Sequence, residues 1–183
     1  VANNIEIMLQ AELADLNMGY AKFKVSFEKE EKVSKNGKDN VEFLIATNVG
    51  QDYKTLTKIA SGGEVSRIML ALKAIFSKVD NIPILIFDEI DIGVGGETVR
   101  KIAGKLKEIG KHAQVICITH SPQIAAKASQ QFYIEKNVVD NTTVTTVREL
   151  NEKERVKEIG RMLAGDNITD TVLNHALELL KED

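Results

Sequence analysis

The stretch KIASGGEVSRIMLALKAIFSKVDNIPILIFDEID, residues 58–91, decides the fold of this chain. It joins a glycine pair, a helical pattern and an apolar run that ends in acidic residues. Residues 82–87 are nearly all apolar, which predicts a strand covered on both faces in a parallel sheet. Apolar side chains also recur at helical spacing after the glycines, which predicts a helix with one face packed inward; they are Val65, Ile68, Met69, Leu72, Ile75, Phe76 and Val79. A helix beside a buried strand favours an α/β fold.

The start of the predicted helix allows two interpretations. Ser61 and Glu64 have the spacing of a capping box, which on its own indicates only a helix start. That interpretation leaves Gly62 and Gly63 unexplained, because each glycine costs a helix about 1 kcal/mol relative to alanine. It also predicts that alanine at Gly63 is neutral or slightly stabilising. In the other interpretation, the glycines let bare N–H groups at the helix start approach an anion such as phosphate.

Acidic residues follow the predicted strand. Asp88, Glu89 and Asp91 come where the chain leaves the apolar run. Open α/β sheets bind their ligands at this carboxyl edge. Acids after a strand are also common as plain loop residues. Two adjacent acids beside a core, however, need a partner or a metal ion, so a ligand site is the sharper hypothesis.

These segments, in this order, resemble the ABC-type ATPases. SGGE after Ala60 is similar to their signature motif, with Glu64 in place of the usual glutamine. ILIFDE is similar to their Walker B motif, and Asp91 falls at the position of their D-loop. The longer segments IASGGEVSRIMLALK, FDEIDIGVGGET and QVICITHSPQIAAKA resemble the structural-maintenance-of-chromosomes (SMC)-like ATPases of bacterial DNA repair. This similarity runs from about residue 18 to the C-terminus.

The resemblance implies an architecture. Residues 1–17 would be the end of a coiled-coil helix, although a packed surface helix explains their pattern equally well. Residues 18–183 would be the C-terminal lobe of an ABC/SMC-type ATPase head, in which helices flank a mostly parallel sheet with added β-hairpins. We expect those hairpins at residues 21–47 and 132–150. We expect further helices over residues 99–109, 152–163 and 170–180, and a loop over residues 48–57.

The resemblance also implies roles for the site residues, with ATP and Mg²⁺ as cofactors. Asp88 would hold Mg²⁺, Glu89 would be the general base, and His120 would contact the γ-phosphate as the switch histidine. The signature residues Ser61, Gly62 and Gly63 would reach the ATP of a second head. Glu64 of the signature and Asp91 of the D-loop would also be cofactor-binding residues. His120 follows a short apolar strand, residues 114–119, and Ser121 and Pro122 then suit the start of a helix.

A phosphate-cradling loop of the form G-x-x-x-x-G-K-[ST], the Walker A motif, is not present in these 183 residues. We therefore expect the chain to be a fragment that needs the N-terminal Walker A lobe of the same protein. Its other expected partners are a second head in a homodimer and, through the complete assembly, DNA. Two alternatives stay open. One is a subunit of another ABC-type ATPase, such as a transporter, and the other is a clamp that binds nucleotide without turnover.

The totals of the chain exclude some classes. A net charge of −3 argues against an autonomous nucleic-acid-binding module, which is usually basic. The single cysteine, Cys117, lies in an apolar run and is expected to be a buried structural thiol. No apolar run is long enough to cross a membrane, so we expect a cytoplasmic protein without a membrane partner. The resemblance implies a bacterial protein associated with the nucleoid.

Overall fold

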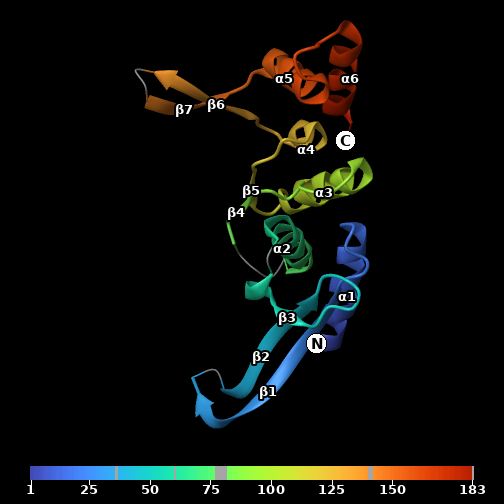
Figure 1. The fold of residues 1–183 in the computed structure, drawn as a ribbon, viewed down its shortest axis with the longest axis vertical. Coiled ribbons are helices and arrows are strands. Elements are labelled where there is room, and N and C mark those ends of the chain that lie inside the picture. Colours follow the sequence, from blue (N-terminus) through green and yellow to red (C-terminus); the bar gives the residue numbers. More distant parts are fainter. Residues whose placement is uncertain (36, 60, 77–81, 140–141, 183) are drawn as a thin grey trace. The chain divides into compact units, whose positions relative to one another are not determined.

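The computed structural model describes residues 1–35, 37–59, 61–76, 82–139 and 142–182 (Figure 1). The chain divides into two compact units, Val1–Ile118 and Thr119–Asp183, which are described separately below. The α/β class is confirmed, since helices accompany one parallel strand pair and two antiparallel sheets. Among the described residues, no helix is long and apolar enough to cross a membrane.

Helix α1 (Ala2–Asp15) opens the first unit. Of the apolar side chains that recur here at helical spacing, Leu9, Leu13 and Leu16 are buried, whereas Met8 is 49% exposed. It ends earlier than its sequence suggests. Asn17 takes a left-handed φ of 59°, and its N–H donates to Ala14 at 3.3 Å. The N–H of Met18 donates to Leu13 at 2.9 Å, which completes a Schellman motif. Gly19, the residue whose type would suit a helix C-cap, therefore does not close this helix, because asparagine also tolerates the left-handed conformation.

A long hairpin follows, formed by β1 (Lys22–Ser34) and β2 (Gly37–Ala46). Its strands extend farther than the apolar alternation, since Ser34 pairs with Gly37 beyond a register shift. The segment expected to be a plain loop holds two further elements. A short strand, β3 (Lys54–Thr55), adds to the edge of β2, and the 3₁₀ helix η1 (Leu56–Lys58) follows it. The predicted hairpin is confirmed, and the predicted turn and loop were too long.

The deciding stretch folds as helix α2 (Gly62–Phe76) and strand β4 (Ile84–Phe87). The predicted helical position Val79 lies outside the described residues. Helix α3 (Gly96–Ile109) then leads to strand β5 (Gln114–Cys117). Strands β4 and β5 are parallel, with Ile84 opposite Gln114 and Phe87 opposite Cys117. Both strands therefore end side by side at one edge.

One face of this parallel pair is left exposed by the described residues of the first unit. Ile84, Ile86, Ile116 and Ile118 alternate onto that face, and Ile86 is 67% exposed. Phe87 points to the opposite face and is buried. The expectation of a strand covered on both faces was wrong for the chain as it stands, because apolar residues alone do not reveal which segment covers them.

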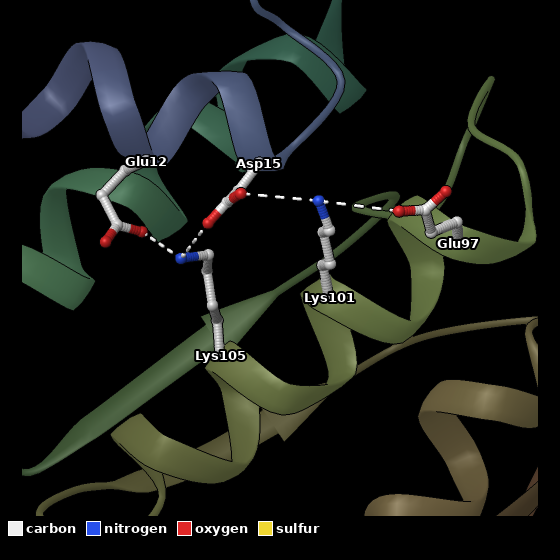
Figure 2. A network of polar contacts seen from close by, with 5 residues as sticks. All are labelled: Glu12, Asp15, Glu97, Lys101 and Lys105. Carbon is white, nitrogen blue, oxygen red and sulfur yellow. Dashed lines mark hydrogen bonds and ion pairs between the residues drawn. The ribbon is translucent and has the colours of Figure 1, made fainter.

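An ion-pair network joins α1 to α3, as Figure 2 shows. Lys105 of α3 pairs with Glu12 and, at 3.5 Å, with Asp15. Lys101 pairs with Asp15 at 3.5 Å and with Glu97 at 3.8 Å. Lys105 and Glu12 are largely shielded from solvent, so this pair is screened less than an exposed one. The network fixes α1 to the helix that follows the acidic loop.

The second unit consists of a three-helix group and a hairpin. Its helices are α4 (Pro122–Lys127), α5 (Glu152–Ala164) and α6 (Asp170–Lys181), which pack around Ile159, Ala176 and Leu179 (Figure 1). The hairpin strands are β6 (Phe132–Val139) and β7 (Thr142–Glu149). The predicted hairpin and terminal helices are confirmed. Asn151 and Glu154 form a complete capping box at the start of α5.

Candidate nucleotide site

The site is built from two segments of the first unit: the start of α2 and the loop after β4. Ser61 precedes α2, and its Oγ accepts a hydrogen bond from the N–H of Glu64 at 3.4 Å. This is the serine half of the predicted capping box. Ser61 and Gly62 are exposed, whereas Gly63 is buried. The helix start thus presents part of its backbone to solvent and packs the rest.

Packing within the chain leaves little room at Gly63, whereas the neighbour of Gly62 is the flexible end of an exposed side chain. A β-carbon at Gly62 would lie 2.8 Å from Oε2 of Glu89. A β-carbon at Gly63 would lie 3.2 Å from the carbonyl oxygen of Glu89 and 3.4 Å from that of Ile92. The start of α2 therefore lies directly against the acidic loop. This gives Gly63 a structural reason that neither interpretation of the sequence included.

The predicted acids differ in their surroundings. Asp88 and Glu89 are exposed at the carboxyl end of β4, whereas Asp91 is only 5% exposed. The backbone of Glu89 has a φ of 57°, a left-handed conformation that is uncommon for a residue with a β-carbon. Such conformations persist only where the surrounding contacts hold them, and they are frequent at functional sites. Glu89, the predicted general base, therefore has a backbone conformation that its neighbours must maintain.

Two polar side chains of α2 hold this loop, and sequence reasoning missed both. Ser66 Oγ donates to the carbonyl oxygen of Asp88 at 2.8 Å, and Arg67 donates from a terminal nitrogen to that of Ile92 at 3.0 Å. Arg67 is 7% exposed, and burial lowers its pKa while the charge of Glu64 opposes that shift. The available signal was its place one helical turn after Gly63, on the buried face of the helix.

His120 follows the neighbouring strand. The N–H of Ile118 donates to the carbonyl oxygen of Phe87 at 2.9 Å, which continues the parallel pairing to the last residue of the first unit. His120 lies two residues farther on, is exposed, and belongs to the second unit. The structure thus brings Asp88, Glu89 and the signature glycines together, and the meeting of His120 with them stays a prediction. Ser121 stands at the expected N-cap of α4, but its hydroxyl donates to Gln123 at 2.8 Å.

Cys117 lies at the end of β5, beside the acids. Burial raises the pKa of its thiol to about 12, and the charges of Asp91 and Asp88 add to the shift. The thiol therefore stays protonated at neutral pH. It is half-buried, so the expectation of a fully buried thiol was wrong.

The residues near β4 fit one part of a magnesium site. Among the described residues, no three His, Cys, Asp or Glu side chains are arranged to hold a metal ion. Asp88 nevertheless offers an exposed carboxylate at the carboxyl end of a parallel strand. Mg²⁺ at nucleotide sites takes one or two carboxylates, with phosphates and water as its other ligands. The donor set fits a shared site to which this chain contributes one ligand.

The sequence comparisons agree with this arrangement. A family model described as "RecF/RecN/SMC N terminal domain" matches residues 3–145. The DNA repair protein RecN of Bacillus subtilis (strain 168) is 49% identical over 150 residues, which cover 82% of this chain and 26% of that protein. RecN of Halalkalibacterium halodurans is 44% identical over 184 residues, covering 98% of this chain and 33% of that protein. The chain thus spans about a quarter to a third of these relatives.

Solved structures give the same fold. The Smc head domain with a coiled coil and joint from Pyrococcus yayanosii has a TM-score of 0.59 at 24% identity, over 86% of this chain and 28% of that one. The Smc head domain of Pyrococcus furiosus, bound to the C-terminal domain of ScpA, has a TM-score of 0.54 at 25% identity, and the match covers 88% of this chain and 38% of that one. The resemblance to SMC-like proteins is therefore confirmed, and this chain belongs to the RecF/RecN/SMC family.

Proposed function

We propose that this chain is the C-terminal lobe of an SMC-like ATPase head that hydrolyses ATP when two heads meet. Residues 1–17 would be the end of the coiled coil and residues 18–183 the lobe itself. The complete protein would act in bacterial DNA double-strand-break repair, in the cytoplasm and at the nucleoid. Support for that role comes from the family and from relatives that carry the name DNA repair protein RecN.

One observation carries the proposal: the carboxyl ends of β4 and β5 lie side by side, with Phe87 opposite Cys117. Asp88 and Glu89 leave the first strand at this edge, and His120 follows the second strand by three residues. Parallel α/β sheets bind ligands at such an edge. The start of α2 packs against the same loop, so all the predicted groups of the first unit share one place.

The uncovered isoleucine face supports a second lobe as partner. Four isoleucines of the parallel pair are exposed on one face, and adjacent exposed apolar side chains mark an interaction surface. Parallel sheets are normally covered on both faces. A match of 150 residues covers 26% of one relative and a match of 184 residues covers 33% of the other, so each is about three times as long as this chain and contains enough sequence for a further lobe. We propose that an N-terminal lobe with the Walker A motif covers these isoleucines.

In the proposed reaction, this chain supplies charge and positioning. Glu89 takes a proton from the water that attacks the γ-phosphate, as a general base. His120 hydrogen-bonds to an oxygen of the γ-phosphate. Asp88 would hold Mg²⁺, directly or through water, and that ion would neutralise charge on the phosphates. Phosphoryl transfer depends mainly on such positioning and electrostatics.

The signature residues would act on a second head in a homodimer. Ser61 and Gly62 are exposed at the N-terminus of α2, where unpaired N–H groups favour a phosphate. Gly63 and Glu64 complete the motif, and Asp91 would contribute the D-loop contact. Nucleotide bound between two heads would join them, and hydrolysis would release them. DNA would bind to the complete assembly.

The test is to reassemble the head from its two lobes. Co-purification and steady-state ATP hydrolysis should appear when this chain is combined with the N-terminal lobe of the complete protein. Ile86→Asp should abolish co-purification, because it places a charge on the apolar face. Val33→Asp is the matched control, since Val33 is equally exposed but lies on the distant end of β1. Nucleotide-dependent dimerisation without hydrolysis would favour the clamp. The absence of both hydrolysis and dimerisation would contradict the ATPase and the clamp alike.

A further inference from the structure

The loop that carries Glu89 is held at both ends by adjacent residues of α2. Ser66 Oγ donates to the carbonyl oxygen of Asp88 at 2.8 Å, immediately before Glu89. Arg67 donates to the carbonyl oxygen of Ile92 at 3.0 Å, at the other end of the loop. Between them, the N–H of Ile92 closes a turn onto the carbonyl oxygen of Glu89 at 3.3 Å. The two α2 donors therefore bracket residues 88–92, which hold the two acids of the predicted Walker B motif and the D-loop aspartate.

Arg67 is an unusual residue for the interior of the first unit. Its guanidinium lies in the interior and donates to a backbone carbonyl, while its Nε has no hydrogen-bond partner among the described residues. A buried cation with unmet donors opposes folding. Gly63 leaves the space that it occupies, because a β-carbon there would lie 3.3 Å from the same terminal nitrogen. The helix start is thus shaped around this arginine.

The segment between the two anchored carbonyls has a defined and unfavourable shape. Glu89 has a φ of 57°, while Ile90 and Asp91 on its far side are buried. A left-handed residue with a β-carbon returns to an ordinary conformation unless its neighbours prevent it. A return at Glu89 would change the direction of its carboxylate and move Asp91. The hydrogen bonds from Ser66 and Arg67 to the carbonyls on either side oppose this change.

We propose that Ser66 and Arg67 are positioning residues, which hold Glu89 and Asp91 in their working geometry and link the signature helix to the acidic loop. This inference rests on the proposed ATPase function for its catalytic consequence, and on the hydrogen bonds alone for its structural one. A movement of α2 on head engagement would pass directly to Glu89 through these two residues. Neither residue needs to contact the nucleotide.

The test uses four variants of the complete protein and two readouts. Ser66→Ala and Arg67→Met remove the donors, whereas Ser66→Thr and Arg67→Lys keep a donor at each position. We expect Ser66→Ala and Arg67→Met to lower kcat between about 10- and 100-fold, as a misplaced catalytic group does, with the KM for ATP changed less than about twofold. The conservative variants should recover most of the loss. Arg67→Met should not lower the melting temperature, because it removes a buried charge.

The second readout needs no turnover. Hydrogen exchange, followed by mass spectrometry in peptides spanning residues 87–92, should be faster in Ser66→Ala and Arg67→Met than in the wild type. Ser26→Ala is the control, because Ser26 also belongs to the first unit and has no side-chain hydrogen bond to a described residue. It should leave both readouts unchanged.

Unchanged kcat and unchanged exchange in both donor-removing variants would overturn the inference. A wild-type protein without ATPase activity would instead overturn the proposed function. In that case, the exchange of residues 87–92 would still decide whether Ser66 and Arg67 hold the loop.

Discussion

Gly62 and Glu89 lie in direct contact: a β-carbon on Gly62 would come within 2.8 Å of Oε2 of the glutamate. The neighbours of Gly63 include backbone oxygens of the same loop, at 3.2 and 3.4 Å from a β-carbon, which shift less easily than that carboxylate. The expectation that alanine at Gly63 is neutral or slightly stabilising therefore changes, and we expect it to destabilise the chain.

Gly63→Ala should lower the free energy of unfolding by about 1–3 kcal/mol, as overpacking of a filled site does. The added methyl group would meet backbone oxygens of Glu89 and Ile92, which shift only if the loop moves. Gly104→Ala is the control, because Gly104 is exposed within α3 with nothing near its β-carbon position. That change should raise the free energy of unfolding by up to about 1 kcal/mol. Denaturant titration of both variants measures the difference, and equal stabilisation would show that the loop yields freely.

Glu89→Gln in the complete protein should preserve ATP binding and lower turnover by about 10²–10⁴-fold. Glutamine is nearly isosteric and keeps the contact with Gly62, but it cannot accept the proton of the attacking water. ATP-bound dimers should consequently accumulate, which size-exclusion chromatography with nucleotide would detect. Single-turnover hydrolysis at the wild-type rate would remove Glu89 from the role of base.

Lys105→Ala should lower the free energy of unfolding by about 1 kcal/mol, which is the upper end of the range for exposed ion pairs. The reason is that the amine of Lys105 is largely shielded from solvent and pairs with two carboxylates. Lys107→Ala provides the comparison on the same helix, where the side chain is exposed, and it should change stability by less than about 0.5 kcal/mol. Denaturation at low and high salt gives the measurement. Equal effects of the two substitutions would mean that the α1–α3 network adds nothing.

Cys117 should react slowly with iodoacetamide in the folded protein. With a pKa of about 12 instead of 9.0, its thiolate fraction at pH 8 is about a thousandfold smaller. Because the folded pKa is the higher one, the effect on stability is absent below about pH 9, and stability is lost as the pH rises from 9 towards 12. Mass spectrometry of timed reactions, with the denatured chain as control, measures the rate. Similar rates in both states would contradict the assigned pKa.

This chain alone should bind ATP with Mg²⁺ only weakly, because it lacks the Walker A amides and lysine that make most phosphate contacts. Calorimetric titration provides the measurement, with the reassembled head as positive control. A micromolar dissociation constant for the chain alone would count against the split-head proposal.

Elements with strong local signals were predicted well from the sequence. The apolar periodicity of α2, the terminal helices over residues 152–163 and 170–180, and the hairpins at residues 21–47 and 132–150 all folded as expected. The pattern of apolar residues failed to predict burial where a different segment has to cover the side chains. The isoleucines of β4 and β5 indicated burial on both faces, and one face is bare in the chain itself.

The candidate site was predictable in its residues but not in its contacts. The order of the glycine pair and the acids pointed to the helix start and the loop after β4, which do meet. The hydrogen bonds from Ser66 and Arg67 could not be read, because they join positions 22 and 25 residues apart. The left-handed backbone of Glu89 was equally hidden, since no glycine or asparagine marks it.

Position 89 bears directly on attempts to make this protein more heat-resistant. Glycine would meet a φ of 57° without strain, whereas glutamate carries it at a cost on the order of 1 kcal/mol. A screen for thermostable variants would therefore favour the loss of this carboxylate, together with replacement of the buried arginine at position 67. Selection for stability would favour substitutions at positions 89 and 67, whereas selection for turnover would remove them. Thermostabilising substitutions are therefore better sought in the helices of the second unit.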